Sequence, residues 1–238
     1  MDEQVDRLVT KAWDKLRETP SNERLLIAVG GIPGSGKTTL SQLIVSRINA
    51  FAQISSPAEP SPAAFVPMDG YHLTRAQLSA LPDPVEAHAR RGAAFTFDAP
   101  AYLDLVRRLR EPLAPESPTI RAPSFDHAVK DPKYDDIAIE AHHRLLVFEG
   151  NYVALDKPLW RDAARLMDEL WFVEVDFDVA RRRLIKRHVA AGIASDEADA
   201  DKRARENDLV NGQEIVDFRL NVDEVIVSRE DEGWAPRG

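Results

Sequence analysis

Eight residues near the beginning of the chain have the types and spacing needed to bind phosphate. Residues 31–38 read GIPGSGKT, which matches the pattern G-x-x-x-x-G-K-[ST]. Glycines at these positions allow backbone turns that a Cβ would forbid, so main-chain amides can converge on phosphate oxygens. The Lys is expected to reach the β- and γ-phosphates, and the Thr hydroxyl is expected to bind Mg²⁺. The predicted nucleotide-binding residues are Gly31, Pro33, Gly34, Ser35, Gly36, Lys37, Thr38 and Thr39.

Two acidic residues stand at the ends of apolar runs that are expected to be strands. Glu149 follows residues 145–148, and beside a phosphate-binding loop an acid in this place is expected to organise Mg²⁺ together with Thr38. Asp69 follows residues 64–68, and its carboxylate could accept the proton of an attacking hydroxyl. The alternative readings are a plain surface acid for Glu149 and a turn or helix cap for Asp69.

A basic run forms the third feature with chemical potential. It consists of Arg181, Arg182, Arg183, Lys186, Arg187 and His188. On a helix these side chains cannot all face one ligand, but Arg183 and Arg187 share a face at i, i+4. We therefore predict that these two arginines neutralise charge on a transferring phosphoryl group. The alternative is a solvated helix face, which is the usual role of a charge run.

Strands and helices are expected to alternate along the chain and to position these groups. The expected strands are 25–29, 64–68, 119–121, 145–148, 170–175 and 225–227, and the expected helices are 2–18, 39–49, 99–109, 159–167, 179–190 and 195–217. This order predicts a single α/β domain over residues 1–238, with a mostly parallel sheet covered by helices on both faces. Ligands of such sheets bind beyond the carboxyl ends of the strands, where the loop and both acids are placed.

Composition excludes several classes of protein. The chain has 238 residues, a net charge of −9 and no cysteine. The negative charge disfavours binding to a nucleic-acid backbone, and the lack of cysteine excludes disulfides and Cys-ligated metals. The apolar runs are too short to span a bilayer, and the acidic start differs from a targeting peptide, so a cytoplasmic protein without membrane contact is expected. The oligomeric state stays open, a homodimer included.

Five blocks of sequence occur in the order found in one known superfamily. They are residues 31–38 (GIPGSGKT), 68–72 (MDGYH), 95–100 (FTFDAP), 122–127 (APSFDH) and 147–152 (VFEGNY). With them, the chain from about Arg24 to Ser228 resembles the uridine kinase / phosphoribulokinase / pantothenate kinase / nicotinamide riboside kinase superfamily. The residues of these blocks, together with RRGA at 90–93, are most similar to those of a poorly characterised bacterial and fungal branch of this superfamily.

This resemblance implies a fold and roles for particular residues. The implied fold is the three-layer sandwich of P-loop NTPases, with an arginine-bearing lid at about residues 179–200. The resemblance also implies ATP as cosubstrate and Mg²⁺ as cofactor. Asp69 is implied as the base and Asp98 as an acceptor of hydrogen bonds from substrate hydroxyls. The residues expected to contact the substrate are Tyr71, His72, Arg91, Asp98, Asp126, His127 and Tyr152. Ala99 and Phe125 replace a His and a Tyr of uridine kinases, which speaks against uridine itself.

Two functions follow from this set of residues. The first is an ATP- and Mg²⁺-dependent kinase that phosphorylates a hydroxyl of a nucleoside, sugar or pantothenate-like metabolite, with Lys37, Asp69, Arg183 and Arg187 in the catalytic site. The second is an ATPase that acts as a nucleotide-dependent switch on a protein partner. A switch needs no acceptor machinery, whereas Asp69, Asp98, Asp126 and His127 together indicate a small-molecule pocket.

Overall fold

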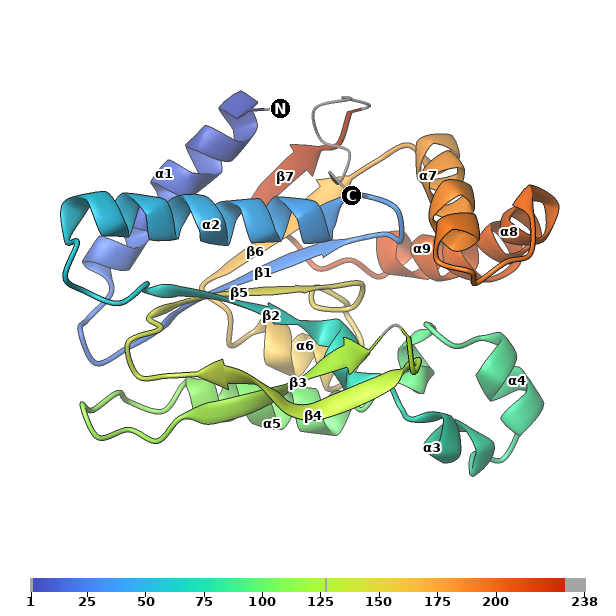
Figure 1. Ribbon diagram of the computed structural model, residues 1–238, viewed down its shortest axis with the longest axis horizontal. Helices are drawn as coiled ribbons and strands as arrows, with labels where there is room; N and C mark the ends of the chain where they lie inside the picture. Colours follow the sequence, from blue (N-terminus) through green and yellow to red (C-terminus); the bar gives the residue numbers. More distant parts are fainter. Residues whose placement is uncertain (1, 127, 230–238) are drawn as a thin grey trace.

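A parallel sheet of five strands lies at the centre of the described residues, 2–126 and 128–229, of the computed structural model (Figure 1). Its strands are β1 (Leu25–Gly31), β2 (Ala63–Pro67), β5 (Leu145–Gly150), β6 (Glu169–Glu174) and β7 (Glu224–Val227), in the order β2-β5-β1-β6-β7. Gly30 pairs with Gly150, and Pro67 pairs with Glu149. The carboxyl ends of β1, β2 and β5 therefore meet at one edge, as the sequence predicts for a parallel sheet.

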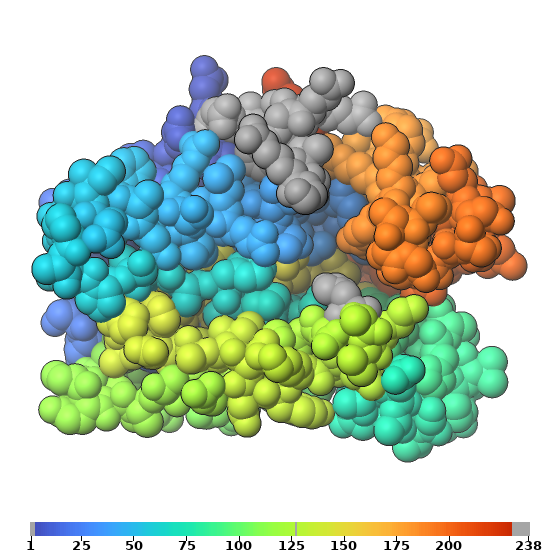
Figure 2. Space-filling view, viewed as in Figure 1, coloured from blue at the N-terminus to red at the C-terminus, as the bar shows by residue number. Residues whose placement is uncertain are grey.

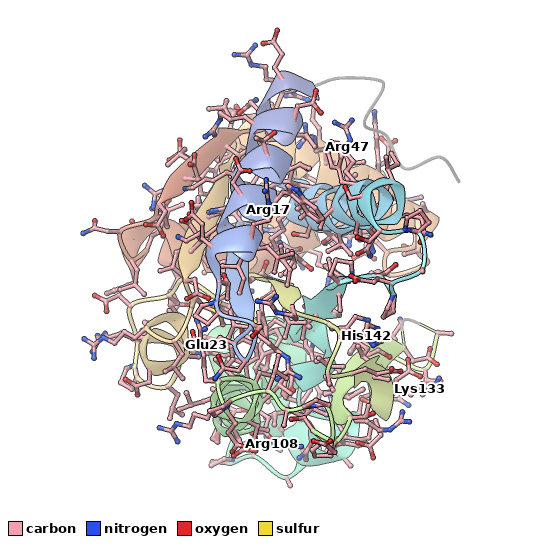
Figure 3. All side chains as sticks on the ribbon, turned by 90° about the vertical axis from the view of Figure 1, so that its left-hand side faces the viewer. Arg17, Glu23, Arg47, Arg108, Lys133 and His142 are labelled. Atoms are coloured by element: carbon pink, nitrogen blue, oxygen red, sulfur yellow. The ribbon has the colours of Figure 1, made fainter. Side chains whose placement is uncertain are left out.

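Alternate side chains of the central strands enter two separate hydrophobic cores. Leu25, Ile27 and Val29 of β1 pack with α1 (Asp2–Glu18) and α2 (Lys37–Ser55) on one face. Leu26 and Ala28 pack on the other face, against α5 (Ala99–Leu109) and α6 (Trp160–Ala164). Figure 3 places Arg17 of α1 and Arg47 of α2 on one side of the molecule and Arg108 of α5 on the other. Because successive side chains of a strand point to opposite faces, the sheet is covered by helices on both sides and forms a three-layer sandwich. The predicted fold class is confirmed.

The remaining helices lie mostly at the end of the molecule that carries the phosphate-binding loop (Figure 1). They are α3 (Arg75–Ser79), α4 (Pro84–Ala89), α7 (Phe177–Ala190), α8 (Glu197–Arg203) and α9 (Leu209–Asp217). Two short 3₁₀ turns, η1 (Met68–Tyr71) and η2 (Ala94–Thr96), precede α3 and α5. A π-helical turn, η3 (Ala204–Asp208), joins α8 to α9, so the predicted helix at 195–217 is continuous but contains one widened turn.

Three sequence predictions need correction. The predicted helix 39–49 is part of a longer helix, since α2 runs from Lys37 to Ser55. The predicted strand 119–121 is the beginning of a longer strand, β3 (Ile120–Asp126), which pairs antiparallel with β4 (Asp131–Ile139). The sequence pattern missed β4 because the middle of the strand is exposed and its first six residues are rich in charge, which leaves no apolar alternation to detect. The predicted helix 159–167 is shorter, since α6 ends at Ala164 and the chain turns there before β6.

A buried carboxylate fastens α1 to the sheet. Glu169 is 4% exposed and accepts hydrogen bonds from Lys11 Nζ at 2.7 Å, from Lys15 Nζ and from Trp171 Nε1 at 2.9 Å. Burial pushes the pKa of Glu169 upward, but the hydrogen bonds from the two lysines and Trp171 outweigh burial and hold it below the ordinary value of 4.5. A depressed pKa in the folded state means that Glu169 stabilises the fold above its unfolded pKa and loses this effect as the pH falls through the folded value.

Replacing Glu169 by Gln should therefore lower stability and flatten its dependence on pH. The expected loss near neutral pH is about 2 kcal/mol, because buried donors lose a charged acceptor. Urea unfolding between pH 3 and pH 7 measures both effects, with Glu59→Gln at an exposed position as the control. An acid-induced loss of stability that is as steep in Glu169→Gln as in the parent chain would contradict this role.

Candidate active site

The phosphate-binding loop connects the end of β1 to the beginning of α2. Gly34 and Gly36 have φ values of 82° and 90°, a left-handed conformation that favours glycine. A Cβ on Gly31 would lie 2.6 Å from Ser35 Oγ and 3.0 Å from the carbonyl oxygen of Val173, so glycine is also required by space. Gly36 is the N-cap of α2 and supplies no capping side chain. The first amides of this 19-residue helix are therefore left for an external anion.

Lys37 and Glu149 form a buried pair at the mouth of the loop. Lys37 Nζ lies 3.8 Å from Glu149 Oε1, and the two residues are 8% and 5% exposed. The Lys37 ammonium also donates to the carbonyl oxygen of Ile32 at 3.4 Å. Burial raises the pKa of Glu149 to about 7, although Lys37 and a hydrogen bond with Thr38 act in the opposite direction. Burial likewise lowers the pKa of Lys37. The structure thus brings Lys37, Thr38 and Glu149 together, as the sequence predicts.

Asp69 lies in η1, directly after β2, and its charge acts on this pair. It is half-buried, and the pairing of Pro67 with Glu149 in neighbouring strands brings the two strand ends together. The negative charge of Asp69 raises the pKa of Glu149 and opposes the lowering of the Lys37 pKa by burial. A carboxylate whose charge acts on both Lys37 and Glu149, at the end of a neighbouring strand, fits the predicted role of accepting a proton from a ligand beside the loop.

The two arginines expected to contact phosphate lie in different surroundings. Arg183 Nη1 donates to the carbonyl oxygens of Gly34 and Ser35 at 3.2 and 3.4 Å and to Ser228 Oγ at 2.9 Å. Arg183 therefore stabilises the loop by hydrogen bonds to the loop's own carbonyl oxygens. The charge of Arg187 acts on both Lys37 and Glu149. Of the two, Arg187 is the residue with electrostatic influence on the buried pair, and its contact with phosphate stays a prediction.

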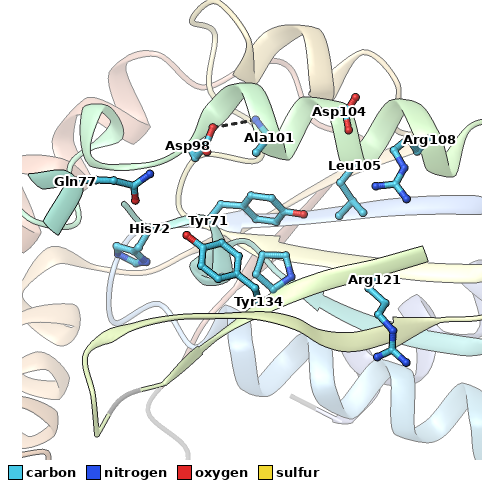
Figure 4. Close-up of a pocket in the computed structure, with 12 residues that line it drawn as sticks. Tyr71, His72, Gln77, Asp98, Ala101, Asp104, Leu105, Arg108, Arg121 and Tyr134 are labelled. Atoms are coloured by element: carbon cyan, nitrogen blue, oxygen red, sulfur yellow. Dashed lines mark hydrogen bonds between the residues drawn. The ribbon is translucent and has the colours of Figure 1, made fainter. Parts of the chain in front are cut away.

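Three of the residues expected to contact a substrate line one cavity of ≈ 210 Å³ (Figure 4). Tyr71, His72 and Asp98 form part of its wall, together with Gly70, the neighbour of Asp69. The cavity lies between α5 and the β3–β4 hairpin, and Arg108 and Arg121 lie at the end opposite His72. Asp98 Oδ1 caps α5 by accepting from the amide of Ala101 at 3.0 Å. His72 Nδ1 lies 2.8 Å from the carbonyl oxygen of Asp69, so its ring also fixes the turn that carries the acid.

Of the other predicted substrate residues, Arg91, Asp126 and Tyr152 lie outside the wall of this cavity. Arg91 binds the carbonyl oxygens of Lys130 and Leu73 and the carboxylate of Asp131. Asp126 Oδ1 accepts from the amides of residues 128 and 129 in the hairpin turn. The buried Tyr152 donates its hydroxyl to the carbonyl oxygen of Gly92 at 2.7 Å. His127 lies outside the described residues.

Residues 26–211 match the model of the Phosphoribulokinase / Uridine kinase family. The chain belongs to this family. Phosphoryl transfer from ATP is the activity that membership implies.

Relatives and solved structures agree with this assignment. The ATP-dependent kinase-like protein notR' of Aspergillus versicolor is 54% identical over 159 residues, which cover 67% of this chain and 92% of that protein. A candidate uridine kinase of Schizosaccharomyces pombe is 38% identical over 206 residues, 87% of this chain and 83% of that protein. The crystal structure of a candidate fructose transport system kinase from Silicibacter is 30% identical, with a TM-score of 0.76 and coverage of 92% of this chain and 98% of that one.

The donor set of this family member fits a magnesium nucleotide. Within residues 2–126 and 128–229, no cluster of three or more His, Asp or Glu side chains could hold a metal by itself. Mg²⁺ commonly takes one or two protein ligands and completes its shell with water and phosphate oxygens, and Thr38 with Glu149 provides such a pair.

Across the described residues, 2–126 and 128–229, no helix is both long enough and apolar enough to cross a membrane.

Sequence reasoning missed a polar network beside the site. Arg90, Asn207 and Asn211 bind one another, and Asp208 pairs with His188 of α7 at 2.9 Å. The signal available in the sequence was two asparagines at i, i+4 in a helical stretch, where buried amides need polar partners. The partner, Arg90, lies more than a hundred residues away in the chain, so spacing alone could not reveal it.

Proposed function

We propose that this family member transfers the γ-phosphoryl group of ATP to a hydroxyl of a small metabolite that is a nucleoside, a sugar or a pantothenate-like alcohol. The observation that carries the proposal is the buried pair of Lys37 Nζ and Glu149 Oε1, 3.8 Å apart. The charge of Asp69, which follows the neighbouring strand β2, acts on both residues. A switch protein needs the loop and a metal ligand, but it has no need of a further acid beside a small cavity. The cavity next to Gly70 supports a small-molecule acceptor.

In the proposed reaction the protein chiefly positions and neutralises charge. The loop amides and Lys37 bind the β- and γ-phosphates, while Thr38 and Glu149 would hold Mg²⁺. A bound Mg²⁺ supplies positive charge against the phosphate oxygens. The acceptor oxygen forms a bond to the γ-phosphorus, the bond between that phosphorus and the bridging oxygen breaks, and ADP leaves with the electron pair. Asp69 accepts the proton of the acceptor hydroxyl, and Arg187 adds positive charge at the phosphoryl group.

The experiment that tests this proposal is a panel of hydroxyl-bearing metabolites with purified protein and MgATP. Release of ADP that one metabolite stimulates, together with a product carrying one added phosphoryl group by mass spectrometry, is the expected result. Turnover of ATP that no metabolite changes, but that a protein partner stimulates, would favour the switch instead. Failure of the protein to bind magnesium nucleotide in calorimetry would overturn both functions.

Asp98→Asn tests the acceptor site once the panel has identified a substrate. One carboxylate oxygen of Asp98 caps α5, and within the described residues the other accepts no hydrogen bond, which leaves it for a substrate hydroxyl. Asparagine can still cap the helix, so the expected effect is a rise in acceptor KM of about tenfold, the loss of one charged hydrogen bond, with a smaller change in kcat. Asp83→Asn is the matched control, because Asp83 caps α4 in the same way. An unchanged KM would remove Asp98 from the acceptor site.

A further inference from the structure

A widened helical turn, which follows the predicted lid region in the chain, carries the first of two buried side-chain amides. The π-helical turn η3 holds Asn207, and Asn211 follows on α9; the two residues are 5% and 2% exposed. Asn211 Nδ2 lies 3.4 Å from Asn207 Oδ1. A π turn contains an extra residue and is often found at functional sites, since it changes which side chains share a face. Buried amides of this kind are costly unless other polar groups satisfy them.

Arg90 satisfies both amides from a distant part of the chain. Its Nε donates to Asn207 Oδ1 at 3.1 Å, and its Nη2 donates to Asn211 Oδ1 at 2.8 Å. Asn207 Nδ2 in turn donates to the carbonyl oxygen of Arg91 at 3.1 Å. In Figure 2, the orange region, which contains α7 and α8 and leads into η3, and the green region that contains α4 lie at the same end of the molecule. The network therefore joins these two parts by three hydrogen bonds.

The segment that begins at Arg90 is also hydrogen-bonded to parts of the chain that lie next to the residues lining the cavity. The guanidinium of Arg91 donates to the carbonyl oxygen of Leu73, four residues after Asp69, at 2.9 Å, and to Asp131 of the hairpin at 3.1 Å. The carbonyl oxygen of Gly92 accepts from Tyr152, which follows the strand of Glu149. Residues 90–92 are thus bonded to the chain that follows the acid in η1, to the hairpin and to the chain that follows β5.

The other end of the network leads to the nucleotide loop. Asp208, next to Asn207, pairs with His188 of α7 at 2.9 Å, and its charge acts on Lys37. Helix α7 packs directly on the loop, because a Cβ on Gly34 would lie 2.8 Å from the carbonyl oxygen of Ala180. The phosphate-binding loop and α7 are therefore in direct contact.

We propose that Arg90 is a positioning residue that couples nucleotide binding at the loop to the ordering of the acceptor segment, residues 90–98, through Asn207 and Asn211. The inference rests on the proposed kinase function. In this proposal, a bound nucleotide restricts the position of α7 and of the π turn η3. Asn207 and Asn211 then restrict Arg90 through their hydrogen bonds, and Arg90 restricts the chain that follows it as far as Asp98. Coupling of this kind requires that the nucleotide bind better to the arrangement in which the network is formed.

Hydrogen exchange of the full chain tests the coupling, with the magnesium complex of a non-hydrolysable ATP analogue as the probe. In the parent chain the analogue should slow exchange at the loop, in α7–α9 and in residues 90–98, the last by about fivefold or more. In Arg90→Ala the analogue should still slow exchange at the loop and in α7–α9, but the effect on residues 90–98 should disappear. Arg107→Ala, at an exposed position on α5, is the control and should behave as the parent chain.

A purely structural role of Arg90 would raise exchange at 90–98 equally with and without the analogue, and the nucleotide-dependent difference would persist. That outcome would overturn the proposal. Asn211→Ala removes one of the two amides from the other side of the contact, so it should reduce the same difference even if Arg90→Ala fails to fold. An undiminished difference in Asn211→Ala would equally overturn it. If no metabolite of the panel yields a phosphorylated product but the nucleotide-dependent difference at 90–98 is present, the kinase function is excluded and the coupling through Arg90 stands. If a product forms but the difference is absent, the kinase function stands and the coupling is excluded.

Discussion

Replacing Asp69 by Asn is expected to remove most phosphoryl transfer and to leave the binding of magnesium nucleotide close to that of the parent chain. Asparagine has the same shape but cannot accept the proton of the acceptor hydroxyl. Loss of a positioned base typically costs about 10²- to 10⁴-fold in rate, and we expect kcat to fall within this range. The charge of Asp69 raises the pKa of Glu149, so its removal favours the ionised form of Glu149, the form that would bind Mg²⁺.

The measurement combines product formation from the identified acceptor with calorimetry of the magnesium nucleotide. Asp83→Asn, which changes a capping aspartate on α4 outside the site, should retain the rate of the parent chain. Product formation by Asp69→Asn at the parent rate would exclude the role of base. Loss of nucleotide binding in the same variant would instead assign Asp69 to the nucleotide site.

The parts of the fold that local chemistry determines could be predicted from the sequence. The left-handed conformation of Gly36 occurs where the motif requires glycine, and that of Gly34 occurs at a glycine within the same loop; the apolar runs of β1 and β5 form the centre of the sheet. The β3–β4 hairpin was underestimated because β4 begins with Asp131 and Pro132 and is stabilised by pairing with β3. The π turn was not predicted either: one extra residue shifts the face on which the later side chains lie, but the acidic stretch 195–217 has too few large apolar residues to reveal such a shift.

The site shows the same division between local and long-range information. The spacing of Arg183 and Arg187 predicts a shared helix face, but it does not say which side of the loop that helix covers. The close approach of Gly34 to Ala180 decides this, and it places Arg183 against loop carbonyl groups. The network of Arg90 depends on contacts between residues 117 and 121 positions apart, which no pattern in a single sequence contains.

Replacing Lys37 by Met is expected to have an effect of similar size through two causes. The first is the loss of a cation that would contact the β- and γ-phosphates, and loss of one such group typically costs about 10²- to 10³-fold in kcat. The second concerns Glu149, which burial already holds at a pKa of about 7 against the opposing charge of Lys37 at 3.8 Å. Without that charge its pKa rises further, so more of Glu149 is protonated at neutral pH, and Mg²⁺ has to displace that proton in order to bind.

A comparison of single and double variants separates these two causes. Glu149→Gln in the parent chain should weaken the Mg²⁺-dependent part of nucleotide binding strongly, because it removes a carboxylate. The same substitution added to Lys37→Met should change that part less, because Glu149 is more often protonated in that background. Calorimetry of the nucleotide with and without Mg²⁺ in the four proteins measures this non-additivity. Equal losses from Glu149→Gln in both backgrounds would mean that Glu149 stays ionised without Lys37, and that the lysine contributes through phosphate contact alone.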